Sequence, residues 1–280
     1  CLNTNDIILL SGAGSSEIGI WNAHSVSETM VQLVPLCDPR CFLEQVRANN
    51  TQPMTEEKEE ENDCRVTCIA ACQLLDNCVF IAGTNDGVLW SCMFDSQHKK
   101  VLIHHKLNLP DAPFCATMLP DTSIVAVGTS GGRVLIVQML PQLKLLECIQ
   151  AHSAGTNCIS VIKTDETCFW IFTGGDCQSI CAIQIVVENG VKIGSTIRTP
   201  SSSFSSITGI HAASTTPNAT MRIETVDIAQ RVINWTFDLN HTCFVKEKEK
   251  DTEVADAAGL VCNASTRLTV GQGICITKRQ

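Results

Sequence analysis

Several residue types are scarce in this chain. Tyrosine is absent, and the aromatic residues are four tryptophans and nine phenylalanines. Charged residues make up 18% of the chain, against about 25% in an average domain, whereas hydrophobic residues reach 44%. No apolar run approaches the roughly eighteen residues that a membrane span needs. This composition predicts a globular chain with a large core and no membrane partner.

Basic side chains are also in short supply, and the net charge is −9. Part of the acidic excess lies in one run, residues 56–61. A surface that binds nucleic acid directly is usually basic, because neutralising phosphates supplies most of the affinity. No basic stripe with interleaved aromatic residues is present. We therefore expect no DNA binding, and no strong direct RNA binding by this segment alone.

The usual catalytic motifs are missing. The sequence has no nucleophile elbow, no glycine-rich loop that would cradle phosphates, and no methyl-donor-binding loop on a βα unit. His104 and His105 are adjacent, and adjacent strand residues point to opposite faces, which argues against joint chemistry. We expect no catalytic and no cofactor-binding residues. The rival hypothesis is a stand-alone enzyme that uses a cysteine such as Cys68 or Cys181.

Cysteine, by contrast, is abundant, with seventeen residues. Structural zinc prefers close cysteine pairs, with two to four residues between the ligands and matched by a second such pair. No pair with two residues between its cysteines is present; the cysteines recur at every fourth position, in the sets Cys64, Cys68 and Cys72, Cys37 and Cys41, and Cys177 and Cys181. On a strand, even spacing places them on one face, where they behave as small buried hydrophobes. We expect no metal site, with zinc the less favoured alternative, and reduced thiols in a cytoplasmic protein.

A glycine-containing turn recurs about every 45 residues. It occupies residues 82–87, 127–132 and 172–176, and the spacing from Gly83 to Gly128 is 45 residues and from Gly128 to Gly174 is 46. Each copy lies between two apolar runs, which is typical of a β-hairpin whose central turn residues adopt positive φ. A hairpin repeat of roughly 40 to 45 residues is the signature of WD-repeat propeller blades.

The apolar runs beside these turns are continuous, as in residues 78–82 and 123–127. A continuous run is buried on both faces and therefore needs a sheet on either side. The sequence thus predicts an all-β WD-repeat β-propeller with about five to six blades in this chain. These blades could belong to a seven-bladed ring. Residues 267–276 are expected to form a terminal hairpin, since a ring closes when its first and last strands pair.

We expect residues 1–280 to form one propeller segment, the C-terminal piece of a longer product because the chain opens on Cys1. An interruption at about residues 34–63 contains three prolines and the acidic run. This composition predicts a partly disordered surface insertion. It also explains why Gly12 and Gly83 are 71 residues apart, since removing roughly 25 residues restores the repeat.

The Trp-Asp signature of the repeat is degenerate. Alignment of the turns places Trp21 and Trp235 at the tryptophan position, whereas Cys92, Val137 and Ile183 occupy it elsewhere. His152 and Asp176 resemble the histidine and aspartate that hold a blade's loops by hydrogen bonds; alternatively, His152 is an ordinary exposed loop residue. The positions predicted to be structural are Trp21, Gly83, Asp86, Gly87, Gly128, Gly132, His152, Gly174, Asp176 and Trp235.

The order of motifs in the last two repeats narrows the family. Residues 173–180 follow residues 152–161, and residues 230–235 precede residues 254–256, Cys262 and the closing residues 271–274. Over residues 150–280 this order resembles the last blades of the WD repeat-containing protein six family, the auxiliary subunit of an FtsJ-like tRNA 2′-O-ribose methyltransferase.

The resemblance implies a non-catalytic scaffold that binds the methyltransferase and helps to present the tRNA anticodon loop. The wobble nucleotide would be methylated, and S-adenosylmethionine would bind to the partner enzyme. The alternative is a generic WD-repeat adaptor in a ubiquitin ligase or in trafficking, with no role in RNA processing. Affinity purification distinguishes the two, because the first recovers a methyltransferase and tRNA and the second recovers ligase subunits.

Overall fold

The computed structural model describes residues 7–13, 17–27, 30–49, 64–74, 77–200, 203, 205–214, 220–246 and 274–277. The fold is all-β, with five antiparallel four-stranded sheets and one α-helix in this part of the chain. None of the described segments is a helix that is long and apolar enough to cross a membrane. The chain divides into two compact units, Cys1–Pro113 with Met139–Lys144 and Gly271–Gln280, and Phe114–Gln138 with Leu145–Val270.

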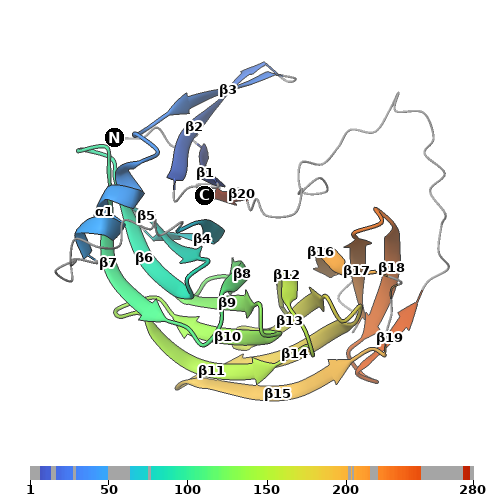
Figure 1. The fold of residues 1–280 in the computed structure, drawn as a ribbon. Coiled ribbons are helices and arrows are strands. Elements are labelled where there is room, and N and C mark those ends of the chain that lie inside the picture. The colour runs from blue at the N-terminus through green and yellow to red at the C-terminus, as the bar shows by residue number, and fades with distance from the viewer. Residues whose placement is uncertain are drawn as a thin grey trace, which may run out of the picture. The chain divides into compact units, whose positions relative to one another are not determined.

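The first unit contains two sheets, whose strands run from blue to green in Figure 1 apart from the red C-terminal strand. The first sheet has the order β20 (Ile274–Thr277), β1 (Ile7–Ala13), β2 (Glu17–Ser27) and β3 (Met30–Pro35). The second sheet has the order β4 (Val66–Leu74), β5 (Asn77–Thr84), β6 (Val88–Asp95) and β7 (Lys100–Asn108).

The first and last strands of the chain pair, as the sequence analysis expected. β20 runs antiparallel to β1, with Ile8 opposite Thr277 and Ser11 opposite Ile274. The first sheet therefore takes three strands from one end of the sequence and one from the other. The other half of the predicted terminal hairpin, residues 267–273, lies outside the described residues.

The second unit contains three sheets, which follow one another from green to orange in Figure 1. The third sheet consists of β8 (Pro113–Met118), β9 (Ile124–Thr129), β10 (Arg133–Gln138) and β11 (Lys144–Gln150). The fourth consists of β12 (Thr156–Lys163), β13 (Cys168–Gly175), β14 (Ile180–Val187) and β15 (Val191–Arg198). The fifth consists of β16 (Ile207–Ser214), β17 (Thr220–Asp227), β18 (Val232–Asp238) and β19 (Cys243–Lys246).

The middle strands are buried on both faces, as their continuous apolar sequences predicted. Every residue of β9 is buried, and so are the four central residues of β10. Ile136 of the third sheet packs in one cluster with Ile171 and Ile183 of the fourth. Between the fourth and fifth sheets, Phe172 and Phe237 meet edge to face with ring centroids 5.3 Å apart. Neighbouring sheets of the second unit thus supply the second buried face.

The recurring glycines allow close approach of neighbouring strands. A Cβ added at Gly83 would lie 2.6 Å from Cys68 Sγ, and one at Gly128 would lie 2.6 Å from Cys115 Sγ. A Cβ at Gly174 would lie 2.9 Å from Cys158 Sγ and would also overlap Ile207, the first residue of the next sheet. The second, third and fourth sheets therefore need glycine beside a cysteine of their first strand, which also explains three of the many cysteines.

The turns themselves have fewer positive φ angles than the sequence predicted for their central residues. In the second and third sheets the turns span three residues, and only the last has positive φ, at Gly87 (81°) and Gly132 (76°). In the fourth and fifth sheets the turns span four residues, and only the third has positive φ, at Gln178 and Gln230, both with φ of 63°. Gly83, Gly128 and Gly174 precede these turns and are required for space, not for positive φ.

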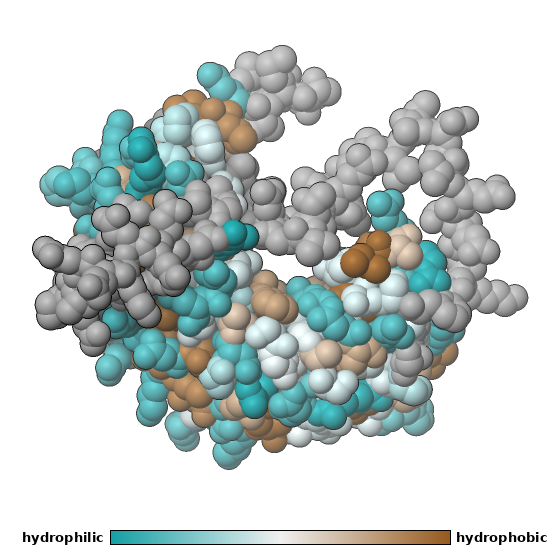
Figure 2. All heavy atoms as spheres, viewed as in Figure 1, coloured by the Kyte–Doolittle hydropathy of each residue, from teal (hydrophilic) through white to brown (hydrophobic). Residues whose placement is uncertain are grey.

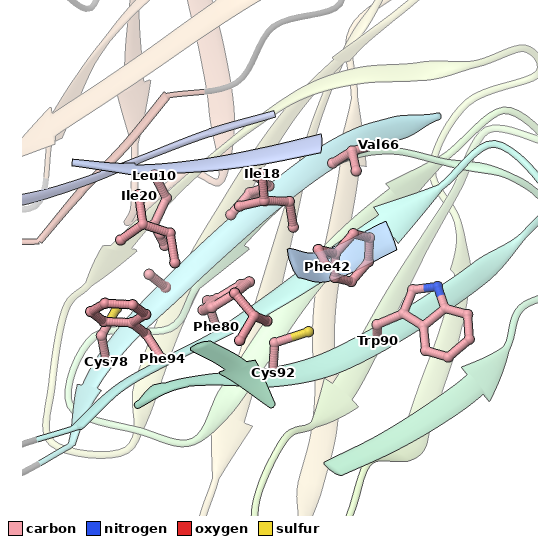
Figure 3. Close-up of a cluster of buried hydrophobic side chains, with 14 of the residues drawn as sticks. Leu10, Ile18, Ile20, Phe42, Val66, Cys78, Phe80, Trp90, Cys92 and Phe94 are labelled. Carbon is pink, nitrogen blue, oxygen red and sulfur yellow. The ribbon is translucent and has the colours of Figure 1, made fainter. Parts of the chain in front are cut away.

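Part of the predicted insertion at 34–63 is regular, which corrects the sequence analysis. Residues Cys41–Asn49 form helix α1. Just before the helix, Asp38 Oδ1 accepts a hydrogen bond from the backbone N–H of Arg40, and Asp38 O accepts one from the backbone N–H of Cys41. Phe42 is fully buried and meets the Trp90 ring edge-on, with centroids 6.4 Å apart (Figure 3). This apolar contact holds the helix on the core of the first unit. Residues 50–63, including the acidic run, lie outside the described residues.

Candidate functional site

The candidate site is a set of loops at one end of the sheets of the second unit. Backbone hydrogen bonds join the connections between sheets to the hairpin turns within them. Gly132 O accepts from His152 N at 2.9 Å, Gly155 O accepts from Asp176 N at 2.9 Å, and Ser206 O accepts from Ile228 N at 2.9 Å. We name these segments the loop face, which comprises residues 130–132, 151–155, 176–179, 203, 205–206 and 228–231.

His152 joins its own loop to strand β13 and to the turn at residues 176–179 through its ring. The residue is 2% exposed, so the alternative of an exposed loop histidine is wrong. Its Nε2 lies 2.8 Å from Thr173 Oγ1, and its Nδ1 lies 3.1 Å from Cys177 Sγ and 3.2 Å from Ser179 Oγ. Burial, assisted by the nearby Arg198 guanidinium, lowers the pKa of His152 to about 4, although Asp176 opposes the shift. The imidazole is therefore neutral near pH 7.

Asp176 occupies a different place from the one expected. The sequence analysis paired it with His152, but its Oδ1 accepts a hydrogen bond from Asn157 Nδ2 at 2.7 Å. Cys177, one residue later, is the turn residue beside the histidine ring. Because Asp176 is exposed and Cys177 is partly buried, the turn directs the carboxylate outward and the thiol inward.

The two predicted tryptophans each donate to a hydroxyl group on the neighbouring strand. Trp235 Nε1 lies 3.1 Å from Thr225 Oγ1, and Trp21 Nε1 lies 3.2 Å from Ser11 Oγ. In both sheets the hydroxyl precedes the tryptophan by ten residues. In the fourth sheet the residue ten positions after Thr173 is Ile183 and not a tryptophan. There the ring of His152 forms the hydrogen bond with the Thr173 hydroxyl instead.

In the second sheet the hydrogen-bonded tryptophan is one that the sequence analysis missed. Trp90 Nε1 donates to Thr84 Oγ1 at 3.2 Å, and that hydroxyl donates to Asp86 Oδ1 at 2.5 Å. Trp90 lies two residues before Cys92, so alignment by turn position passed over it. Asp86 therefore stabilises its own turn, and Gly87 O accepts from Leu109 N at 2.8 Å.

The fifth sheet uses an ion pair that the sequence analysis also missed. Asp227 is 3% exposed and accepts from Arg231 Nε at 3.0 Å and from Ser203 Oγ at 2.9 Å. Burial by itself raises the pKa of Asp227, but hydrogen bonds from the Arg231 backbone and guanidinium and from Ser203 outweigh it and lower the pKa. An aspartate four residues before an arginine across a turn was the available signal.

The exposed side chains of the loop face are mixed in character. Ile228 is 61% exposed, and Phe114 of strand β8, which lies against Gly155 at the border of the face, is 41% exposed. Asp176 and Gln230 are exposed beside them. In the view of Figure 2, hydrophilic and hydrophobic residues are interspersed over the second unit without one dominant patch. Among the described residues, no group of three His, Cys, Asp or Glu side chains is placed to hold a metal ion.

No protein-family model matches this chain, and no curated protein matches it either. The loop face consists of firmly hydrogen-bonded loops that present scattered apolar and polar side chains. Such a surface suits recognition of a macromolecule.

Proposed function

We propose that the five sheets are blades of a WD-repeat β-propeller and that the chain is a scaffold subunit without catalytic chemistry of its own. Three observations support the propeller. The sheets are four-stranded and antiparallel, the turn repeats about every 45 residues, and the last strand pairs with the first. Propellers place their variable loops at the two ends of the blades, which is where such proteins bind partners.

The observation that carries the scaffold proposal is the way in which the loop face is held. Each connection in the second unit is tied to a turn by backbone hydrogen bonds, and each tie is reinforced by a buried polar side chain, His152 or Asp227. Loops fixed in this way lose little conformational entropy when a partner binds. Ile228 and Phe114 are the exposed apolar side chains available for contact.

The proposed partner is an FtsJ-like tRNA 2′-O-ribose methyltransferase, and the scaffold helps to position tRNA for methylation of the wobble nucleotide. The order of motifs over residues 150–280 supports this partner. The net charge of −9 favours a protein partner for this chain, with the basic RNA contacts and S-adenosylmethionine on the enzyme. The complex would act in the cytoplasm.

Affinity purification of the full-length parent protein from its own cells tests the proposal. The wild type is expected to recover a methyltransferase and tRNA, and Ile228→Glu is expected to reduce recovery of both by about tenfold or more, since it places a charge at a contact site. Val245→Glu is the matched control, because Val245 is 54% exposed on the outer strand β19, away from the loop face. Recovery of ubiquitin-ligase or trafficking subunits without tRNA would instead support the generic adaptor.

A further inference from the structure

Cys177, His152 and Ser179 form a group of three polar side chains on the loop face. A scaffold function alone would not need a reactive cysteine in this group. Cys177 Sγ lies 3.1 Å from His152 Nδ1 and 2.9 Å from Ser179 Oγ, and these two groups lie 3.2 Å from each other. The histidine is buried, whereas the cysteine is partly exposed. A nucleophile within hydrogen-bond distance of a buried imidazole is the usual arrangement of an activated thiol.

The hydrogen bonds of His152 determine which ring nitrogen carries the proton. Thr173 Oγ1 lies 2.8 Å from His152 Nε2 and 3.5 Å from Cys181 O, and its hydroxyl has one proton to donate. The shorter contact receives that proton, so Nε2 accepts from the threonine. In the neutral ring Nδ1 therefore carries the proton and can donate to Cys177 Sγ or Ser179 Oγ.

The surroundings of the sulfur favour the thiolate. Burial raises the pKa of the Cys177 thiol, but hydrogen bonds from Ser179 and Ser153 outweigh it and lower the pKa below its ordinary value. By contrast, burial raises the pKa of Cys68 and Cys158 to about 12 and that of Cys181 to about 11. Thiolate character and access to solvent together decide which cysteine of a protein reacts first.

We propose that Cys177 is an oxidative modification site of this chain, with hydrogen peroxide as its co-substrate. The thiol proton leaves to solvent, and the Ser179 hydroxyl donates to the thiolate that remains. The thiolate attacks one peroxide oxygen, so that a sulfur–oxygen bond forms as the oxygen–oxygen bond breaks. Sulfur loses two electrons, the other peroxide oxygen leaves as hydroxide and becomes water, and Cys177 becomes a sulfenic acid. His152 is a positioning residue in this step.

Treatment of the full chain with a few equivalents of hydrogen peroxide, with dimedone to trap sulfenic acid, tests the proposal by peptide mass spectrometry. The matched references are Cys148 and Cys243, both more exposed than Cys177. Reactivity set by exposure would label these two first. The proposal predicts about tenfold more adduct at Cys177 than at either at pH 7. Equal or faster labelling of Cys148 and Cys243 would overturn it.

A variant of the serine separates a reactive group from a structural one. Ser179→Ala removes the donor to the thiolate and is expected to slow modification of Cys177 several-fold and to move its pH dependence to higher pH. Ser195→Ala is the control, because Ser195 lies on the exposed strand β15 and uses its backbone N–H to bond Gln184. Circular dichroism verifies that both variants fold. An unchanged rate and pH profile in folded Ser179→Ala would refute the role of this group.

Discussion

The fourth and fifth sheets solve one structural problem with different chemistry. Each must tie an incoming connection to the turn between its second and third strands. In the fourth sheet a buried neutral histidine contacts a threonine, a cysteine and a serine. In the fifth sheet a buried carboxylate contacts Arg231 and Ser203, and Trp235 contacts Thr225. Both sheets need hydrogen-bonded polar groups between the connection and the turn. The residues that supply those hydrogen bonds can therefore differ from sheet to sheet.

The two sheets also differ in where they place a glycine. Cys158 lies opposite Gly174 in the fourth sheet, whereas Gly209 lies opposite Val226 in the fifth. The small and large residues have exchanged strands, and a Cβ added at Gly209 would lie 3.5 Å from Val226 Cβ. The space between the two strands is thus filled in both sheets, but from opposite sides.

The largest loss of stability is expected when the repeat glycine of the fourth sheet is replaced by a large residue. Gly174→Val would overlap Cys158 and Ile207 and should destabilise the chain by about 3 kcal/mol or more. Adding Cys158→Gly should recover part of the loss, because it recreates the arrangement of the fifth sheet. Denaturant unfolding of the single and double variants measures the coupling. Strict additivity would show that the two residues do not share this space.

Removing the histidine should have the next largest effect. His152→Ala leaves a cavity and deprives the Thr173 and Ser179 hydroxyls of a partner, which should cost about 2–3 kcal/mol. Hydrogen exchange should rise at residues 151–155 and 176–179, with the fifth sheet unaffected. Exchange that rises equally in the fifth sheet would mean that His152 does not act locally.

Acid should distinguish the two sheets. The folded pKa of His152, about 4, lies below that of an unfolded histidine, about 6.5, so between these values the unfolded chain binds more protons. Stability from this group is complete above pH 6.5 and is lost as the pH falls towards 4. Unfolding free energies measured from pH 7.5 to 4.5 should fall with a slope of up to about 1.4 kcal/mol per pH unit, and His152→Gln should flatten it.

The carboxylate of the fifth sheet should respond only in stronger acid and with a smaller effect. The pKa of Asp227 is lowered on folding, so its contribution is present above the ordinary aspartate pKa and is lost as the pH falls through the folded value. Asp227→Asn should cost about 1–2 kcal/mol at pH 7 and should leave the slope above pH 4.5 unchanged. If Asp227→Asn flattened the dependence of the unfolding free energy on pH above 4.5, the acid sensitivity there would come from the fifth sheet and not from His152.

The sequence predicted the sheets because each turn lies between continuous apolar runs, a pattern that only strands flanked by other sheets can satisfy. It predicted less of the fifth sheet, where Val226 stands at the position of the repeat glycine and Gly209 lies on the partner strand. Helix α1 was missed because Phe42 and Val46, the buried apolar residues among those of the helix whose burial is described, are too few to show a helical period among prolines and charges.

The loop face was only partly predictable. His152 stood out because a histidine before a glycine-bounded strand is typical of the repeat. Its true turn partner, Cys177, could not be distinguished from Asp176, since side chains one residue apart in a turn point in different directions. Trp90 was missed for a related reason, because its bond to Thr84 depends on a register that turn spacing does not specify.

Mapping of tRNA ribose methylation in cells that lack the parent gene tests the proposed function most directly. The account predicts loss of 2′-O-methylation at the wobble nucleotide, with recovery on expression of the wild type or Val245→Glu and not of Ile228→Glu. Wobble methylation that persists in the deleted cells would contradict it.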